Sequence, residues 1–225
     1  MKAEIVYEDN NIIICNKPAG MPSQSDRGFS QDLCGYVRTY LVRAGRQDEV
    51  HIINRLDRPV GGLVLFALNR QTAAALSAMS GEHSIEKNYL ALVEGVTDDK
   101  GTLQNYLLKD AKENISRIVP DDTDGAKKAV LSYERIAECE VEGRKTSLVD
   151  VRLHTGRHHQ IRVQFAGIGH PLVGDFKYNH GPVQKGMTPM LFAYRLAFNN
   201  PAGADRIQVE IRPKGGLWDD IKLER

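Results

Sequence analysis

The sequence has few of the residues that hold small or secreted proteins together. Its 225 residues include only three cysteines, Cys15, Cys34 and Cys139, and no CxxC pair. An odd count without paired spacing argues against a disulfide framework and against a zinc ribbon. Free cysteines are typical of a reducing compartment, so we predict a cytoplasmic protein.

Long apolar runs and low-complexity segments are also missing. No run of 18 apolar residues occurs, which argues against a transmembrane helix and predicts no membrane partner. The first residues, Met1 to Ile5, lack the charged and then apolar pattern of a secretory signal. Hydrophobic residues make up 41% and charged residues 26%, a composition that excludes global disorder. With no repeat or linker, we predict one domain over residues 1–225.

An excess of one charge is absent as well. Lysine and arginine number 30 and aspartate and glutamate 29, a net charge of +1. This sum alone argues against a polynucleotide partner, because such proteins usually carry a basic excess. The distribution is uneven, however, since residues 144–170 hold five basic side chains and a single acid, Asp150. That window fits either a groove for phosphates or a solvated helix face.

Strand-like runs outnumber helical ones. We predict strands at 3–7, 11–15, 63–68, 88–94, 128–136, 146–153, 190–198 and 206–211. Helical spacing favours helices over 30–44 (capped by Ser30), after a cap at Asn69, and over 157–167. Residues 120–125 read as a polar loop between strands. Because strands do not alternate regularly with helices, the pattern predicts an α+β fold on a mixed, mainly antiparallel central sheet.

The segment Arg55-Leu56-Asp57-Arg58-Pro59 is the first candidate site. Pro59 disfavours helix at Arg58, and an apolar strand follows, so Asp57 is expected on a loop with a rigid exit. A nearby guanidinium would keep its carboxylate ionised and available as a nucleophile or base. The alternative is an Asp–Arg pair that only stabilises a turn.

The segment Thr155-Gly156-Arg157-His158-His159-Gln160-Ile161-Arg162 is the second. We expect Thr155 to cap a helix whose first N–H groups suit a phosphate, with Arg162 about a turn and a half inside. The histidines lack HExxH spacing, and we predict no metal. Tyr89, at the start of a strand, could stack on a flipped base or be an ordinary core aromatic. Residues 169–175 lack Walker or Rossmann spacing, so no nucleotide cofactor is expected.

Taken in order, these segments resemble the RluA family of pseudouridine synthases over nearly the whole chain. The matching stretches are Tyr7-Glu8-Asp9-Asn10, Asn16-Lys17-Pro18-Ala19-Gly20, Arg55-Leu56-Asp57 with residues 62–67, Lys87-Asn88-Tyr89-Leu90-Ala91, residues 155–162, Gly169-His170-Pro171-Leu172-Val173-Gly174-Asp175 and residues 191–196. Because the first motif begins near Tyr7, no N-terminal S4 domain is expected.

The resemblance implies the pseudouridine synthase α+β fold with a central active-site cleft. It implies isomerisation of a specific uridine in tRNA or rRNA to pseudouridine, with base flipping and without cofactor or metal. Asp57 would be the essential catalytic aspartate acting on the ribose, Tyr89 would stack on the base and help handle protons, and Arg162 would pair with Asp57. Arg55 would contact RNA, and we place Arg58, Arg157, His158 and Gln160 with it as substrate-binding residues. We expect a monomer.

The sequence departs from the family pattern at Asn54, at Pro59-Val60-Gly61-Gly62 and at Gln164. These changes could alter how the motif loop sits or which RNA is accepted. Two alternatives remain: a non-catalytic RNA-binding protein on the same scaffold, and an unrelated hydrolase using the histidines. The RNA interpretation also predicts a basic cleft around Asp57, with acids such as Asp219, Asp220 and Glu224 lying away from it.

Overall fold

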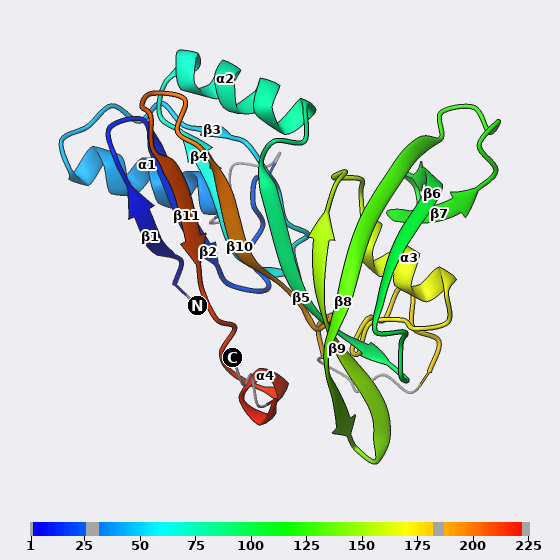
Figure 1. Cartoon of the computed structure of the whole chain (residues 1–225). Coiled ribbons are helices and arrows are strands. Elements are labelled where there is room, and N and C mark those ends of the chain that lie inside the picture. The colour runs from blue at the N-terminus through cyan, green and yellow to red at the C-terminus, as the bar shows by residue number, and fades with distance from the viewer. Residues whose placement is uncertain (1, 26–31, 182–186, 222–225) are drawn as a thin grey trace. The chain divides into compact units, whose positions relative to one another are not determined.

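The computed structural model describes residues 2–25, 32–181 and 187–221 (Figure 1). Two compact units make up the chain, one from residues 1–86 and 193–213 and the other from residues 87–192 and 214–225. The single domain over residues 1–225 stays a prediction. None of the helices in the described ranges has the length and apolarity that crossing a bilayer requires.

The first unit is built on a sheet with the strand order β1-β2-β4-β10-β11. Its strands are β1 (Glu4–Glu8), β2 (Ile12–Lys17), β4 (Gly61–Ala67), β10 (Leu191–Asn199) and β11 (Arg206–Glu210), and the short β3 (His51–Ile52) pairs with β4. Both faces of β2 and β4 are buried, since consecutive residues such as Ile12 and Ile13, whose side chains point to opposite faces, are fully covered. The continuous apolar strand predicted over 63–68 is therefore confirmed.

Two helices flank the strands of this unit, α1 (Leu33–Arg43) and α2 (Arg70–Gly81). The Asn69 side chain accepts a hydrogen bond from the Thr72 N–H at 2.8 Å, which confirms the predicted cap of α2. Asp32 caps α1 by accepting from the Gly35 N–H at 2.7 Å. The cap predicted at Ser30 lies outside the described residues, and α1 begins later than the sequence indicated.

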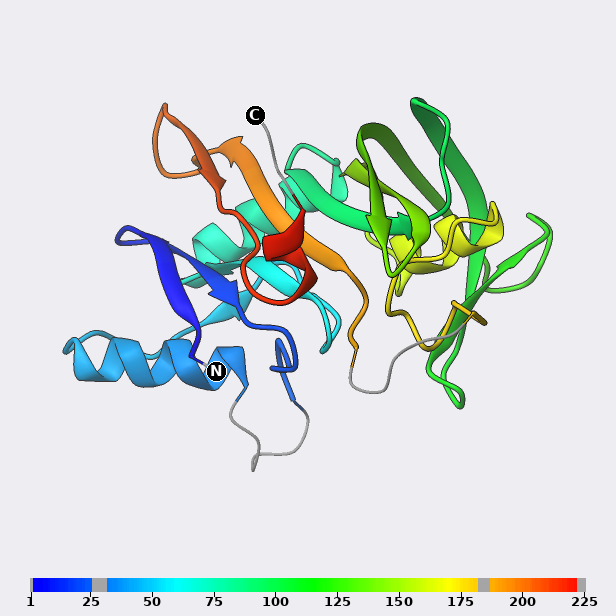
Figure 2. The same cartoon turned by 90° about the horizontal axis from the view of Figure 1, so that it is seen from below.

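The second unit carries an antiparallel series of strands in the order β5-β9-β8-β6-β7 (Figure 2). They are β5 (Glu86–Glu94), β9 (Arg144–Leu153), β8 (Lys127–Val141), β6 (Lys100–Asp110) and β7 (Ile115–Val119). Its helices are α3 (Gln160–Gly167) and the short α4 (Leu217–Asp220). The predicted loop at 120–125 separates β7 from β8. β6 and β7, like the short β3, have no counterpart among the predicted strands, but the mainly antiparallel α+β class is confirmed.

Candidate active site

The loop that carries Asp57 is held through the backbone of its neighbour Leu56. The Ser23 hydroxyl donates to the Leu56 carbonyl at 2.9 Å and accepts from the Leu56 N–H at 3.1 Å. The Val60 N–H donates to the Asp57 carbonyl at 3.0 Å, which closes a turn on the far side. Asp57 itself is half-buried. Its side chain thus lies on a loop that is fixed on both sides, as the sequence predicted for its exit.

Lys17, at the end of β2, lies buried beneath the same loop. Its ammonium group donates to the carbonyls of Met21 at 2.7 Å, Pro18 at 3.2 Å and Arg58 at 3.3 Å. Burial lowers the pKa of Lys17 to about 8, against an opposing attraction to the Asp57 carboxylate. One buried cation therefore ties the residues after β2 to the loop that follows Asp57.

The lowered pKa of Lys17 predicts a pH-dependent contribution to stability. Its pKa is about 8 in the folded protein against an ordinary 10.5, so the unfolded chain binds more protons between these values. The wild type should therefore gain about 3 kcal/mol in free energy of unfolding relative to Lys17→Met as pH rises from about 8 to about 10.5. Urea unfolding of both proteins across this range measures the difference.

Taking the difference between two proteins cancels the cysteines and tyrosines, which titrate in the same alkaline window in both. Lys100→Met, at the exposed start of β6, is the reference for losing one lysine at a solvent-facing site. A wild-type minus Lys17→Met difference that stays flat across the window would contradict the lowered pKa of Lys17 in the folded protein.

Two departures from the family pattern have structural roles in this loop. The Asn54 amide donates to the Leu63 carbonyl at 3.3 Å and accepts from the Leu65 N–H at 2.8 Å, so it binds β4 in the manner of a strand partner. Gly62 has φ +118°, and a Cβ there would lie 2.2 Å from the Ala193 carbonyl oxygen. Glycine is required at this position by both conformation and space.

The arginines on either side of Asp57 differ in their surroundings. The Arg58 Nε–H donates to the Gly20 carbonyl at 3.0 Å, while the Gly20 N–H donates back to the Arg58 carbonyl at 2.8 Å. Arg58 thus helps join the two loops. Arg55 is exposed. Its place among the substrate-binding residues stays a prediction, as does that of Arg58.

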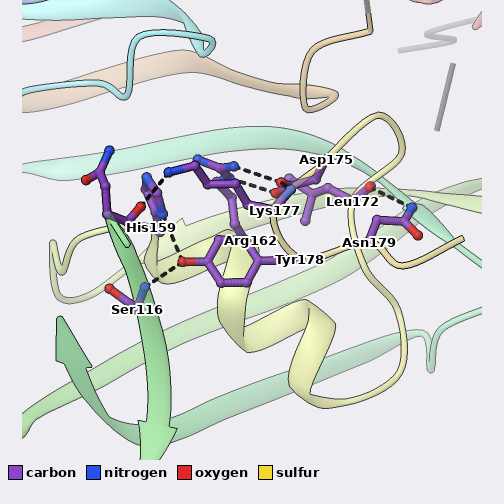
Figure 3. Close-up of polar contacts among 9 residues, drawn as sticks. Ser116, His159, Arg162, Leu172, Asp175, Lys177, Tyr178 and Asn179 are labelled. Carbon is purple, nitrogen blue, oxygen red and sulfur yellow. Dashed lines mark hydrogen bonds and ion pairs between the residues drawn. The ribbon is translucent and has the colours of Figure 1, made fainter. Parts of the chain in front are cut away.

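Tyr89 and Arg162 belong to the second unit. Tyr89 lies on β5 opposite Val151 of β9 and is only 6% exposed. Arg162 is 1% exposed, and its guanidinium forms a bidentate ion pair with Asp175 through Nε and Nη2, each at 2.7 Å (Figure 3). The expected pairing of Arg162 with Asp57 stays a prediction.

The start of α3 differs from the sequence-based expectation. The helix begins at Gln160, and its N-cap is His159, whose backbone is left-handed with φ 53°. Thr155 does not cap it, because the Thr155 hydroxyl donates to the Gln160 side-chain oxygen at 2.8 Å. Arg162 is consequently the third helical residue, within the first turn. The predicted Thr155 cap and the helix start at 157 were wrong.

The substrate-binding candidates His158 and Gln160 are both held by neighbours. The His158 ring contacts the Ser116 hydroxyl at 2.9 Å and the Asn114 side-chain oxygen at 3.1 Å. The Gln160 side-chain oxygen accepts from the Arg157 N–H at 3.0 Å as well as from Thr155. The Gln160 amide nitrogen is buried and has no hydrogen-bond partner in the described structure.

The histidines considered for a metal site, His154, His158 and His159, contact other side chains. His154 lies 3.0 Å from the Ser132 hydroxyl and His159 lies 2.8 Å from the Tyr178 hydroxyl. Within residues 2–25, 32–181 and 187–221, no three potential metal ligands gather into a site. The basic window is partly neutralised too, since Arg144 pairs with Glu94 at 2.8 Å and Arg162 with Asp175. Glu224, one of the acids expected away from Asp57, lies outside the described residues.

Sequence reasoning missed Ser23, Lys17 and Asp175 as members of the candidate site. Lys17 and Asp175 lie in motifs that the family resemblance already marked, so the motifs were the available signal. Nothing in the sequence around Ser23 indicates that its hydroxyl bridges to Leu56, 33 residues later.

Comparison with known proteins identifies the family to which the chain is similar. Residues 11–167 match the protein family described as RNA pseudouridylate synthase. A tRNA pseudouridine synthase C from Yersinia pestis is 30% identical over 96% of this chain and 87% of its own length. A ribosomal large subunit pseudouridine synthase D from Zymomonas mobilis is 32% identical over 78% of this chain and 55% of its own. The solved human RNA Pseudouridylate Synthase Domain Containing 1 superposes with a TM-score of 0.78 at 22% identity, covering 95% of this chain and 84% of that one.

The fold is therefore that of the pseudouridylate synthases. The chain belongs to the RluA family of RNA pseudouridine synthases, and it is an isomerase. The resemblance read from the motifs is thereby confirmed, while the roles of individual residues stay predictions.

Proposed function

We propose that this protein isomerises a specific uridine of tRNA or rRNA to pseudouridine, with Asp57 as its essential catalytic residue. The N1–C1′ bond breaks, the uracil turns, and C5 bonds to C1′ while the C5 proton leaves and N1 gains one. The supporting observation is a half-buried carboxylate on a loop fixed by Ser23 and Lys17, in a chain of this family. A rigid carboxylate suits action on the ribose at C1′.

Tyr89 and Arg162 complete the proposed chemistry at one bound uridine. Tyr89 offers an aromatic face to a base that has left its stack, which lowers the cost of flipping. Arg162 supplies a fixed positive charge for the Asp57 carboxylate. We propose that neither a cofactor nor a metal takes part.

tRNA is the first substrate to test. The Yersinia relative named for tRNA matches over 87% of its own length, whereas the Zymomonas relative named for the large ribosomal subunit matches over 55% of its own. The test uses RNA transcribed with uridine that carries tritium at C5, because the isomerisation releases this tritium to water. Release of about one tritium per target molecule is expected. A folded protein that releases none from transcripts of the tRNAs and of the rRNAs would overturn the proposal.

Arg157 is proposed to contact an RNA phosphate, and Arg55, Arg58, His158 and Gln160 are proposed as further substrate-binding residues. The exposed Arg157 side chain is anchored through its Nε–H to the Lys128 carbonyl at 2.9 Å. Arg157→Ala should weaken RNA binding and reduce the slope of log Kd against log salt by about 1. Filter binding between roughly 50 and 200 mM salt measures this slope.

Arg70→Ala is the matched control for the salt slope. It removes an arginine at the start of α2 whose side chain is 92% exposed. We expect its slope to equal that of the wild type. Equal slopes for wild type and Arg157→Ala would show that Arg157 does not contact a phosphate.

A further inference from the structure

The Arg162 guanidinium is held by a buried carboxylate from a different segment of the second unit. The Nε–H and one Nη2–H donate to the two Asp175 oxygens, each at 2.7 Å, and the Asp175 side chain has no exposed surface (Figure 3). A two-pronged contact of this kind fixes the plane of the guanidinium as well as its position.

Tyr178 holds the same guanidinium through its ring. The Arg162 Cζ atom lies 5.3 Å from the centroid of the Tyr178 ring, within the range of a cation–π contact. The Tyr178 hydroxyl accepts from the Ser116 N–H of β7 at 2.6 Å and lies 2.8 Å from His159 Nδ1. The ring is therefore fixed by contacts from two other elements.

His159 holds Tyr178 without adding a second positive charge. Burial, followed by the nearby Arg162, lowers the pKa of His159 to about 3, so the ring is neutral at physiological pH. The Tyr178 hydroxyl and His159 Nδ1 share one hydrogen bond at 2.8 Å, beside the one that the hydroxyl accepts from the Ser116 N–H. The His159 ring also meets the Tyr178 ring edge to face, with centroids 5.6 Å apart.

The turn that follows Leu172 sets the place of Asp175. Gly174 has φ +75°, and a Cβ there would lie 2.5 Å from the Thr188 carbonyl oxygen. The Lys177 N–H donates to Asp175 Oδ1 at 3.0 Å, and the Asn179 N–H donates to the Asp175 carbonyl at 2.8 Å. These contacts hold the Asp175 carboxylate in the orientation in which its two oxygens accept hydrogen bonds from the Arg162 guanidinium.

Stability alone is a weak reason for this arrangement. A buried ion pair is commonly no more stable than apolar side chains of the same volume, because both charges lose their hydration. We propose that Asp175 and Tyr178 are positioning residues that fix the guanidinium plane of Arg162 for its part in the isomerisation. The inference rests on the proposed function, since it assigns a task to the neighbours of a proposed catalytic residue.

The test is the single-turnover rate of tritium release with each protein in saturating excess over RNA. Under these conditions a smaller folded fraction leaves the rate constant unchanged, whereas a misplaced guanidinium lowers it. Asp175→Asn should reduce the rate constant about 100-fold, the loss typical of a small misplacement of a reacting group, with RNA affinity within about threefold. Tyr178→Leu should reduce it about 10-fold, and Tyr178→Phe, which keeps the ring, less.

A double-mutant cycle separates positioning from a merely structural role. Arg162→Lys keeps the charge but removes the planar fork, so adding Asp175→Asn to it should cost less than about threefold more. Tyr133→Phe is the control, because Tyr133 packs on Phe165 of α3 at a ring distance of 5.2 Å and has no part in the Arg162 contacts. Its rate constant should equal that of the wild type.

The outcomes distinguish the two proposals. An active wild type with Asp175→Asn reacting equally fast, or with additive losses in the cycle, overturns the positioning role alone. A wild type that releases no tritium, or an active Asp57→Asn, overturns the proposed function instead.

Discussion

Asp57→Asn is expected to reduce tritium release from RNA by at least about 1,000-fold, the largest effect of any single change proposed for this protein. Asparagine keeps the size of the side chain but lacks the negative charge that the chemistry at the ribose requires. Ser23 and Lys17 hold the loop through backbone atoms, so the variant should still fold, with a loss in free energy of unfolding of about 1–2 kcal/mol that includes the lost attraction between Asp57 and the buried Lys17. Single-turnover tritium release and urea unfolding measure the two quantities.

Asp48→Asn is the matched control for this experiment. It makes the same chemical change at an exposed position of the same unit, outside the loop that carries Asp57. Both its rate constant and its stability should match those of the wild type. Activity of Asp57→Asn within about 10-fold of the wild type would remove Asp57 from the catalytic role.

The elements that the sequence predicted well are those with strong local signals. The strand at β4 is a continuous apolar run, and the start of α2 has an asparagine whose side chain reaches the third residue beyond it. By contrast, β6 alternates between exposed and half-buried residues and covers only Leu107 fully. Pairing with β8 and β7 defines that strand, and pairing partners are not visible in a local window.

In the candidate site, too, features with a strong local signal could be predicted, whereas those that depend on tertiary contacts could not. Asp57 and Tyr89 could be placed on a loop and a strand from their neighbours alone, and the structure agrees. The start of α3 could not be predicted from neighbouring residues. Its N-cap is His159 in a left-handed conformation, and the rings of His158 and Tyr178 contact the ring of His159. Such a conformation is uncommon for a residue other than glycine and depends on these tertiary contacts.

The number of basic side chains in residues 144–170 became informative about phosphate binding only when their acidic partners were known from the structure. The window at 144–170 suggested five basic groups for phosphate binding. Arg144 pairs with Glu94, and Arg162 pairs with Asp175. Arg157 keeps an exposed side chain. The excess visible in sequence therefore mixes groups that build the fold with groups that can meet RNA.

Asp175→Ala should lower the free energy of unfolding by about 3–5 kcal/mol, because it leaves the Arg162 charge buried without its carboxylate. Urea unfolding with linear extrapolation measures the loss. Arg117→Ala is the control, since it breaks a more exposed pair with Asp110 at 3.7 Å in the same unit and should cost less than about 1 kcal/mol. A loss below about 1 kcal/mol for Asp175→Ala would contradict the buried pair.

Replacing both Arg162 and Asp175 tests whether their buried ion pair contributes to catalysis or to folding. Arg162→Met with Asp175→Leu fills the space with apolar groups and removes both buried charges, so stability should be within about 1 kcal/mol of the wild type or above it. The same protein should release tritium at least about 1,000-fold more slowly, because the guanidinium is gone. A stable but inactive double variant would mean that the buried ion pair contributes to catalysis rather than to folding. An unstable one would instead make Arg162 and Asp175 part of what holds α3 to the turn after Leu172.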